Sequence, residues 1–411
     1  MTQARSDLRP TLDDSRALFE HSPMAQETVS APTSGFRKTS ETFVPGAKTL
    51  PREYFVSPQC FAAEAEELFA REWICVGHQS QLAQPGDYFL RQVAGENLII
   101  VRDRQSQIRA HYNVCRHRGT RLLEEAGGHC SAIQCPYHAW SYGLDGRLVG
   151  APHMDEAPGF RKEDYPLHSA QAGVWEGLIF VSLAKSPKPL LEVFAPLAGK
   201  FSNWNLPSLQ SARRIEYDIK ANWKLMFQNY SECYHCPGVH PALARISPYD
   251  SSENDLSEGP FLGGFMVMGK GRSLTMSGRA CAPPVGEIKS EDQSRIFYYS
   301  IFPNLLLSLH PDYVMVHLLW PQSPERTLIW CDWYFHPEVT RTKNQGYNPD
   351  DAIEFWDMTN RQDWHVCELS QQGITSRSYQ PGPYSARESI PAAWDRYYLS
   401  LIDRRVAPGD R

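Results

Sequence analysis

The sequence predicts an α+β protein made of a small all-β domain followed by a larger domain that mixes strands with helices. The chain of 411 residues is longer than one typical domain, and its 42% of hydrophobic residues can fill more than one core. Short β-rich runs separated by glycine-containing turns crowd between residues 74 and 183. Residues from 348 onward instead repeat their apolar side chains with a helical period.

Four segments follow one another along the predicted chain. Residues 1–48 are rich in Ser, Thr, Pro and Ala with little hydrophobic periodicity, so we expect a flexible extension. Residues 49–73 form a leading helix region, since apolar side chains recur at helical spacing after a Ser-Pro start signal at Ser57. The small β domain then spans residues 74–185, and the larger domain spans residues 190–411 after a proline-rich boundary. The clearest strands are expected at 97–102, 132–135, 178–182, 214–219, 313–320 and 327–335.

The charge of the chain favours small molecules or proteins as partners over nucleic acid or a membrane surface. The 41 basic and 47 acidic residues give a net charge of −6 without long blocks of one sign. The longest apolar stretch, residues 301–320, contains Pro303, His310 and Asp312, so no segment offers the roughly 20 apolar residues that span a bilayer. The N-terminus lacks the features of a secretory signal, so we expect a cytoplasmic protein whose ten cysteines are free to bind metal.

Two cysteines and two histidines in the small domain form the first candidate metal site. One residue separates Cys115 from His117 and, after a gap of 17 residues, two residues separate Cys135 from His138. Thiolates and imidazoles from two loops can hold either a structural zinc ion or a [2Fe–2S] cluster. Zinc modules usually pair two cysteines and then two histidines, whereas here each loop supplies one of each, and this order favours the cluster.

These two loops resemble the Rieske motif, C-x-H followed by C-x-x-H. The likeness extends to Arg118 and Gly119 after the first pair and to Tyr137 and Trp140 around the second, which are similar to the residues of ring-hydroxylating oxygenase α subunits. The resemblance implies four ligands to a Rieske [2Fe–2S] cluster: Cys115, His117, Cys135 and His138.

A second candidate site lies in the larger domain, where a helical run from residue 222 meets a break. Glu232 and His235 are three residues apart and would share a helix face, but His240 lies about 140° further around the helix. Pro237 and Gly238 break the helix and allow His240 to turn back toward His235. Two converging histidines with a carboxylate from elsewhere would form a 2-His-1-carboxylate triad, which leaves positions open on Fe(II). Taken alone, the two histidines fit core packing equally well; the upstream motif favours the metal.

The phase of the C-terminal helical run selects the carboxylate. With Asp363 set at 0° and 100° per residue, four residues fall within about 60° of it: Trp356, Asn360, Cys367 and Ile374. Asp357, Glu354 and Glu368 lie about 120° or more away and are expected to face solvent or the rim. Because a lone carboxylate that faces the core is costly, a metal partner is the reasonable explanation for Asp363.

The motifs around both candidate ligand sets extend the resemblance to Rieske non-haem iron oxygenase α subunits. Residues 229–237 and 362–368 are similar to motifs of that family, and the likeness covers about residues 50–400. It implies a helix-grip-like catalytic domain built on an antiparallel sheet. The implied ligands of a mononuclear Fe(II) are His235, His240 and Asp363.

The same resemblance implies how electrons reach the iron. Glu232 occupies the position where many relatives carry an acid that bridges the two metal centres. In the family, electrons cross between subunits of a homotrimer, here from His138 through Glu232 to His235. The neighbouring Cys233 and Cys236 are expected only to pack.

The partners and the substrate class also follow from resemblance. No G-x-G-x-x-G follows a strand, so a separate reductase must supply electrons from NAD(P)H, with O2 and a small molecule as the substrates. The sequence from Glu232 to Cys236 looks like the branch of choline, carnitine and glycine betaine monooxygenases, which implies oxidation of an N-methylated quaternary ammonium compound. An aromatic cage would suit such a cation, although most of the candidates are expected to be core residues: Tyr298, Tyr299, Phe302, Trp320, Tyr334 and Tyr384.

Three alternatives remain open from the sequence. The same triad would serve the mono- or dihydroxylation of an aromatic ring if the pocket were apolar. Without chemistry at the second site, the chain would be a Rieske electron-transfer protein. With zinc in place of the cluster, it would be a zinc-stabilised binding module.

Overall fold

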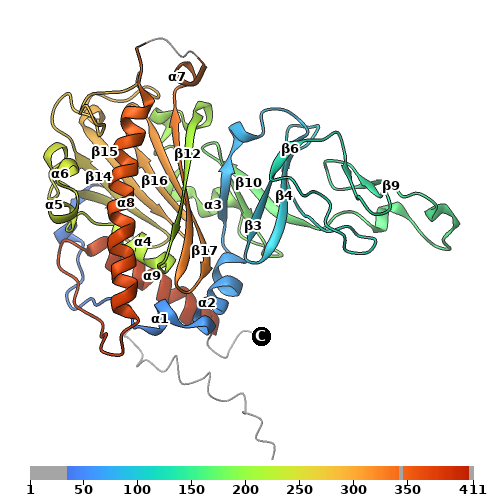
Figure 1. Ribbon diagram of the computed structural model, residues 1–411, viewed down its shortest axis with the longest axis horizontal. Helices are drawn as coiled ribbons and strands as arrows, with labels where there is room; N and C mark the ends of the chain where they lie inside the picture. Colours follow the sequence, from blue (N-terminus) through green and yellow to red (C-terminus); the bar gives the residue numbers. More distant parts are fainter. Residues whose placement is uncertain (1–34, 342–345, 407–411) are drawn as a thin grey trace, which may run out of the picture.

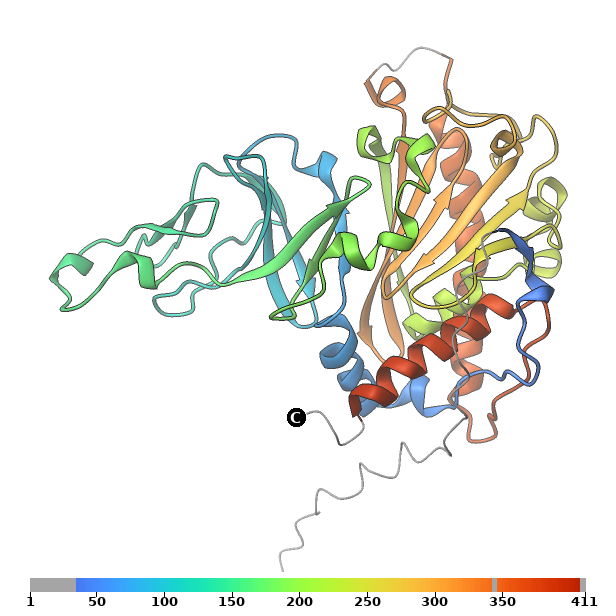
Figure 2. The same ribbon diagram turned by 180° about the vertical axis from the view of Figure 1, so that it is seen from behind.

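The computed structural model describes residues 35–341 and 346–406, with side chains as far as residue 402. A small domain of β-strands lies beside a larger domain in which helices cover a broad sheet (Figure 1). The view from behind shows the same two domains, arranged along the long axis of the molecule (Figure 2). The predicted α+β class with an all-β first domain is confirmed.

The small domain is built on a seven-stranded antiparallel sheet, with a separate sheet of three short strands beside it. Alternate side chains of one central strand face two different cores, as the period of two in a strand requires. Leu98 and Ile100 join the core that continues into the larger domain, whereas Ile99 and Val101 join a second core that contains the predicted cysteine ligands. The seven strands, in spatial order, are β2 (Ile74–His78), β11 (Leu178–Ser182), β10 (Ser169–Trp175), β5 (Ile108–Tyr112), β4 (Glu96–Arg102), β3 (Asp87–Val93) and β6 (Gly127–His129). The three short strands are β7 (Ile133–Gln134), β8 (Ser141–Tyr142) and β9 (Leu148–Gly150).

The larger domain contains an eight-stranded sheet in which each neighbouring pair is antiparallel, as predicted. Its longest strands are rich in β-branched and aromatic side chains, which suit a pleated surface covered on one side by a helix. In spatial order the strands are β1 (Arg37–Lys38), β13 (Glu253–Leu256), β14 (Phe261–Val267), β15 (Arg295–Ile301), β16 (Leu305–Leu309), β17 (Val314–Ser323), β18 (Arg326–Phe335) and β12 (Gln210–Ile219).

The long helix α8 crosses one face of this sheet (Figures 1 and 2). It begins after Asn348 with Pro349 in its first turn, where a missing backbone N–H costs nothing. The four residues of the predicted inward stripe are all buried, so the helical phase is confirmed. No helix in the described part of the chain is long and apolar enough to cross a bilayer. The helices are α1 (Glu53–Val56), α2 (Pro58–Glu64), α3 (Leu190–Val193), α4 (Trp223–Tyr230), α5 (Cys236–Val239), α6 (Pro241–Ile246), α7 (Pro337–Arg341), α8 (Pro349–Ile374) and α9 (Ser389–Val406).

The N-terminal segment differs from the sequence prediction. Residues 1–34 lie outside the described residues, but residues 35–48, which we expected in a flexible extension, lie against the larger domain. Strand β1 pairs with β13 at the edge of the large sheet, and the Thr39 hydroxyl bonds to the Ser252 hydroxyl at 2.8 Å. The pairing uses backbone groups of an edge strand, which a search for hydrophobic periodicity does not detect.

The two domains are joined by polar contacts as well as by a shared core. The side chain of Asn304 donates to the carbonyl of Cys75 and accepts from its backbone N–H, both at 2.9 Å. The Arg91 guanidinium of the small domain lies 4.7 Å from the ring centroid of Trp330 in the larger one. These contacts hold β2 and β3 of the small domain against the larger domain.

A buried ion pair fixes the leading helices to the larger domain. Lys224 Nζ lies 2.5 Å from Glu64 Oε1, and both side chains are at most 1% exposed. The indole N–H of Trp223 and the hydroxyl of Tyr398 also donate to this carboxylate, at 2.9 and 2.5 Å. The carboxylate therefore has a partner for each oxygen, which a buried charge requires.

Glu64→Ala should destabilise the folded chain by about 3–5 kcal/mol, because the variant leaves the ammonium group of Lys224 buried without its counter-ion. The measurement is denaturant-induced unfolding followed by circular dichroism. The matched control is Glu66→Ala, two residues along the same helical segment and exposed, which should change stability by less than about 0.5 kcal/mol. Equal losses in the two variants would contradict the assignment.

Candidate metal centres

The two loops of the small domain have the same backbone construction. In the first, the N–H of Cys115 donates to the carbonyl of Thr120 at 2.8 Å, and the N–H of Gly119 donates back to the carbonyl of Cys115 at 3.0 Å. In the second, Cys135 bonds in the same way to Trp140, at 2.8 Å, and to Ala139, at 3.1 Å. Gly119 and Ala139 both have positive φ angles, of 74° and 57°. Each loop therefore folds back tightly on its own cysteine.

The side chains of these loops converge, with the cysteines inside and the histidines outside. Cys115 and Cys135 are each 3% exposed, and the ring centroids of His117 and His138 are 4.8 Å apart. Trp140 stacks on His117 with ring centroids 4.8 Å apart. His138 Nδ1 is buried without a hydrogen-bond partner, as expected for an atom whose partner is a metal.

The spacing of the four side chains bears on the choice between zinc and a cluster. A single tetrahedral zinc ion would bring its four ligand atoms within about 4 Å of one another. Among the described residues, the one group of three or more candidate ligands whose atoms all lie within 4.8 Å is His235, His240 and Asp363. The wider set in the small domain instead suits ligands shared between the two irons of a cluster.

The second site is built where helix α4 ends, and it ends earlier than predicted. Helix α4 ends at Tyr230, so Glu232 and His235 lie in the turn that follows rather than on a helix. The Glu232 carboxylate accepts the backbone N–H groups of Tyr234 and His235, and such bonds compete with the continuation of a helix. Pro237, which we expected to break the helix, lies in the first turn of α5, where proline is tolerated.

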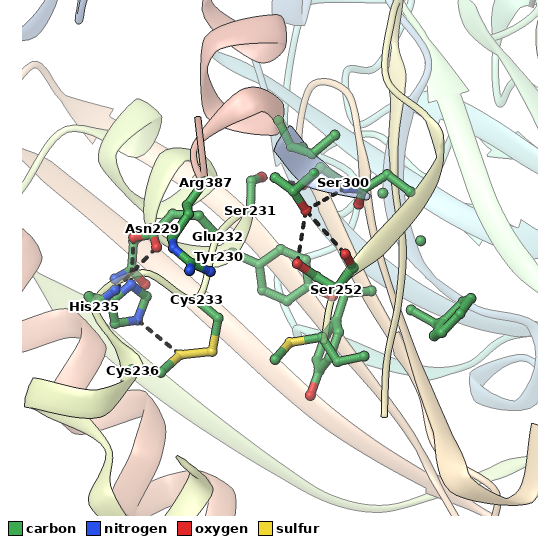
Figure 3. Close-up of a pocket in the computed structure, with 18 of the residues that line it drawn as sticks. Asn229, Tyr230, Ser231, Glu232, Cys233, His235, Cys236, Ser252, Ser300 and Arg387 are labelled. Atoms are coloured by element: carbon green, nitrogen blue, oxygen red, sulfur yellow. Dashed lines mark hydrogen bonds and ion pairs between the residues drawn. A yellow bond between two sulfur atoms is a disulfide. The ribbon is translucent and has the colours of Figure 1, made fainter. Parts of the chain in front are cut away.

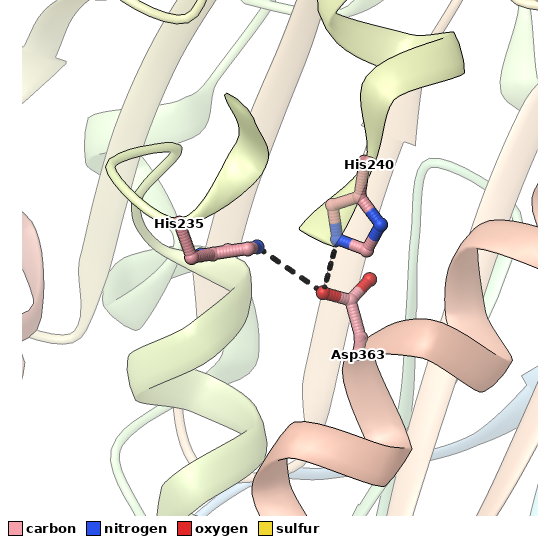
Figure 4. Close-up of side chains that lie close together, drawn as sticks. All are labelled: His235, His240 and Asp363. Atoms are coloured by element: carbon pink, nitrogen blue, oxygen red, sulfur yellow. Dashed lines mark hydrogen bonds and ion pairs between the residues drawn. The ribbon is translucent and has the colours of Figure 1, made fainter. Parts of the chain in front are cut away.

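The turn brings the three predicted iron ligands together (Figure 4). Asp363 Oδ1 lies 2.7 Å from His240 Nε2 and 3.2 Å from His235 Nε2. His235 precedes α5, His240 precedes α6, and Asp363 projects from the middle of α8. Two imidazole nitrogens and one carboxylate oxygen thus point at a common position, which is the donor set of a facial triad.

The other ring nitrogens of both histidines are held by neighbouring acceptors. His235 Nδ1 lies 2.5 Å from Glu232 Oε1, and His240 Nδ1 lies 2.7 Å from Gln362 Oε1. Because both acceptors are oxygen atoms, each Nδ1 carries a proton, and Nε2 is the nitrogen that a metal would bind in place of a proton. Burial disfavours the charged form of His235, but the bonds to Asp363 and Glu232 outweigh burial and raise its pKa to about 10.

Cys233 and Cys236 do more than pack, contrary to our prediction. Their sulfur atoms form a disulfide that closes the turn around His235 (Figure 3). The other eight cysteines are free thiols. The bond links Cys233, in the middle of the turn, to Cys236, the first residue of α5, so it restricts how far His235 can move.

The disulfide predicts a thiol count. Alkylation of the unfolded protein with iodoacetamide should modify eight cysteines without reductant and all ten after reduction, as resolved by mass spectrometry. The peptide that contains residues 233 and 236 should account for the whole difference. Ten modified cysteines before reduction would contradict the bond.

An open pocket of about 820 Å³, including space continuous with solvent, reaches the triad. All three candidate iron ligands line it, together with Glu232 and the disulfide. Figure 3 labels His235, Glu232 and the two cysteines. Aromatic side chains form part of its wall: Tyr230, Phe265, Tyr298 and Trp356. Thr39, from the N-terminal segment, and Arg387, just before α9, also line the pocket.

Comparison with known proteins agrees with this geometry. Residues 72–164 match the Rieske [2Fe-2S] domain, and residues 206–403 match the ring hydroxylating alpha subunit (catalytic domain). The glycine betaine monooxygenase oxygenase subunit of Chromohalobacter salexigens is 31% identical over 378 residues, which cover 83% of this chain and 82% of that protein. The chain belongs to the Rieske non-haem iron oxygenases.

Two further proteins are similar to this Rieske oxygenase over most of their length. The carnitine monooxygenase oxygenase subunit of Acinetobacter baumannii is 31% identical over 340 residues, covering 81% of this chain and 87% of that protein. A solved quaternary ammonium Rieske monooxygenase has a TM-score of 0.75 at 28% identity, covering 90% of this chain and 100% of that chain.

Membership of the family establishes the cofactors. The oxygenase carries a Rieske [2Fe–2S] cluster and a mononuclear iron, and it is the oxygenase subunit of a system in which a separate reductase supplies electrons. The residues present fit both groups: the unpartnered Nδ1 of His138 suits the cluster, and the convergent oxygen and nitrogen donors suit the iron.

Sequence reasoning missed several residues of the pocket and one residue that supports an iron ligand. Of the six aromatic cage candidates, Tyr298 lines the pocket and the other five are buried in the core. Tyr230 lies in the motif of residues 229–237, in which we had assigned functions only to Glu232 and His235. Trp356 was predicted only as a core residue. Gln362 directly precedes Asp363, and this proximity was the one signal for its role. Nothing in the local sequence around Thr39 or Arg387 pointed to the site.

Proposed function

We propose that this oxygenase uses O2 and electrons from its reductase to oxidise a small N-methylated quaternary ammonium compound of the betaine, carnitine or choline type. The observation that carries the proposal is a pocket in which an aromatic wall and the candidate iron ligands face the same space. The two relatives described above at 31% identity are named for glycine betaine and carnitine, which carry a trimethylammonium group.

The aromatic wall has the composition that a quaternary ammonium cation requires. The ring centroids of Tyr230 and Tyr298 are 5.8 Å apart at 79°, and those of Tyr298 and Trp356 are 6.4 Å apart at 67°. Each aromatic ring that lines the pocket can attract a cation placed within about 6 Å of its face. A cation that cannot donate hydrogen bonds gains its binding energy in this way.

We assign the ligands residue by residue. Cys115 and Cys135 would bind one iron of the cluster, and His117 and His138 the other. His235, His240 and Asp363 would bind the mononuclear iron. When bound, the two centres supply single electrons and the activation of dioxygen.

The residues around the mononuclear site orient its ligands. Nδ1–H of His235 donates a hydrogen bond to Glu232, and Nδ1–H of His240 donates one to Gln362. Both rings are therefore fixed with Nε2 facing the carboxylate of Asp363. The disulfide keeps His235 in its turn. The aromatic wall binds the substrate cation beside this site and limits the access of water to it.

We further propose a homotrimer in which Glu232 links the cluster of one chain to the iron of the next. Within one chain, the segment around β9 and the helices α5 and α6 lie at opposite ends of the molecule in Figure 1. Tyr137, beside His138, and Tyr234, beside His235, are 55% and 56% exposed, as expected for surfaces that another subunit covers. The solved quaternary ammonium Rieske monooxygenase was described with inter-subunit electron transfer. We propose a cytoplasmic location, where NAD(P)H is available to the reductase and where a disulfide such as that between Cys233 and Cys236 is uncommon.

Substrate-dependent oxygen uptake with a surrogate reductase tests the proposed function. Glycine betaine, L-carnitine and choline are supplied separately, and formaldehyde is measured as the product of N-demethylation. We expect at least one of the three to stimulate oxygen uptake, while aromatic acids do not. Stimulation by an aromatic acid together with no response to any of the three would favour ring oxygenation instead. A reduced Rieske signal in electron paramagnetic resonance is expected throughout and excludes the zinc alternative.

A further inference from the structure

A single basic side chain lines the pocket described above. Arg387 is the one lysine or arginine among the pocket-lining residues, and it lies in the turn that leads into α9. Figure 3 shows it among the residues around Glu232 and His235. A cation in a pocket for a cationic substrate needs an explanation, because like charges repel.

The guanidinium of Arg387 has no acidic partner within the described residues. Its backbone N–H bonds to Ser385 Oγ at 3.2 Å, and its guanidinium carbon lies 5.0 Å from the ring centroid of Tyr249. No ion pair joins it to any carboxylate of the described chain, whereas Arg214 and Arg326, for example, are each paired with an aspartate. The ring of Tyr249 supports the side chain from one side and leaves its five N–H donors available.

The acids of the pocket are already occupied. Glu232 bonds to His235 and to two backbone N–H groups, and Asp363 bonds to both histidines. The neighbouring Glu388 accepts from the backbone N–H of Ser385 at 2.8 Å. The pocket therefore offers one unpaired positive charge, that of the exposed Arg387 side chain, to whatever enters it.

Two other features favour an anion at the same place. Helix α9 has 18 residues, and Ile390 in its first turn lines the pocket, so the positive end of the helix dipole faces this region. Asn229 also lines the pocket, and no hydrogen bond joins its side chain to another described residue, so its amide is available as a further donor. Arginine with an amide donor is a combination that recognises a carboxylate.

We propose that Arg387 binds a carboxylate of the substrate, so that the oxygenase prefers N-methylated amino or hydroxy acids, which are zwitterions, over choline. The inference rests on the proposed function and narrows it. The aromatic wall takes the ammonium group, and Arg387 takes the carboxylate at the other end of the molecule. Choline fills the first position and leaves the guanidinium unpaired.

The test compares kcat/KM for glycine betaine, L-carnitine and choline in the full-length oxygenase with a surrogate reductase. Wild type should prefer a carboxylated substrate over choline by about 2- to 10-fold, because solvent partly screens the exposed guanidinium. Arg387→Gln should remove that preference, chiefly through KM, while kcat/KM for choline stays unchanged or rises. Arg387→Lys should restore part of the preference, since it keeps the charge and loses the forked geometry.

The matched control is Arg245→Gln on α6, which removes one exposed arginine outside the pocket and should leave all three substrates unaffected. Equal losses for choline and the carboxylated substrates in Arg387→Gln would overturn the carboxylate role and leave the proposed function standing. A wild type that prefers choline would do the same. If wild type oxidised none of the three, the proposed function itself would fail, and this inference with it.

Discussion

Asp363→Ala should remove the mononuclear iron and leave the Rieske cluster in place. The iron content should fall from about three to about two per chain, because the cluster contributes two and the triad one. The physical reason is the position of the Asp363 carboxylate, which lies 2.7 and 3.2 Å from the two histidine nitrogens and supplies the one anionic ligand of the set. Substrate-dependent oxygen uptake should be lost, while the reduced-cluster signal in electron paramagnetic resonance keeps its amplitude.

The matched control for this variant is Glu354→Ala, which removes an exposed carboxylate from the same helix, nine residues earlier. It should retain all three irons and its turnover. Loss of the cluster signal in Asp363→Ala would indicate general unfolding, and full iron retention would show that Asp363 is not a ligand.

Asp363 could be selected from the sequence because its helix is long and regular. Helix α8 runs without interruption over 26 residues, so the angular position of each side chain follows from counting. The strands of both domains could be located for a similar reason, since β-rich runs between glycine turns keep a period of two. Such predictions require only the period of side chains in a helix or a strand and the residue at which that period starts.

The arrangement around His235 could not be predicted in the same way. The turn after α4 depends on the Glu232 carboxylate binding the backbone N–H groups that follow it, and the disulfide depends on that turn. A helix continued through residue 235 would have placed the same residues at similar spacings. Two competing local structures with similar sequence signals are separated only by such side-chain contacts.

Thr39 and Arg387 were beyond local reasoning for another cause. They are about 350 residues apart in the chain, yet both line one pocket, and the Thr42 and Ser389 hydroxyls near them lie 2.8 Å apart. Strand β1 reaches its place by pairing with β13, and α9 reaches its place by packing against the core. Tertiary contacts between distant segments produce no hydrophobic period in the sequence of either segment, so a search for periodicity does not detect them.

Glu232→Gln should slow turnover by about 10- to 100-fold while both metal centres stay loaded. Glutamine retains a side-chain oxygen that can accept a hydrogen bond from Nδ1–H of His235, so the ring keeps its orientation, but the negative charge beside it is lost. That charge lies beside Nδ1 of the iron-binding ring of His235 and, in the proposed trimer, occupies the path between His138 of one chain and His235 of the next. The measurement combines iron quantitation with the rate of single-turnover oxidation of a pre-reduced cluster.

Glu232→Ala separates the positioning role from the charge. Alanine removes both the bond to His235 and the bonds to the backbone of the turn, so this variant should lose mononuclear iron as well as rate, whereas the glutamine variant loses rate alone. If cluster oxidation in Glu232→Gln remained as fast as in wild type, with product formation still coupled to it, Glu232 would be a positioning residue only, and the path between subunits would have to avoid it. If the cluster of Glu232→Gln is oxidised slowly although all its iron is bound, the orientation of the ligands cannot explain the slow rate. That result would identify the carboxylate as part of the electron path.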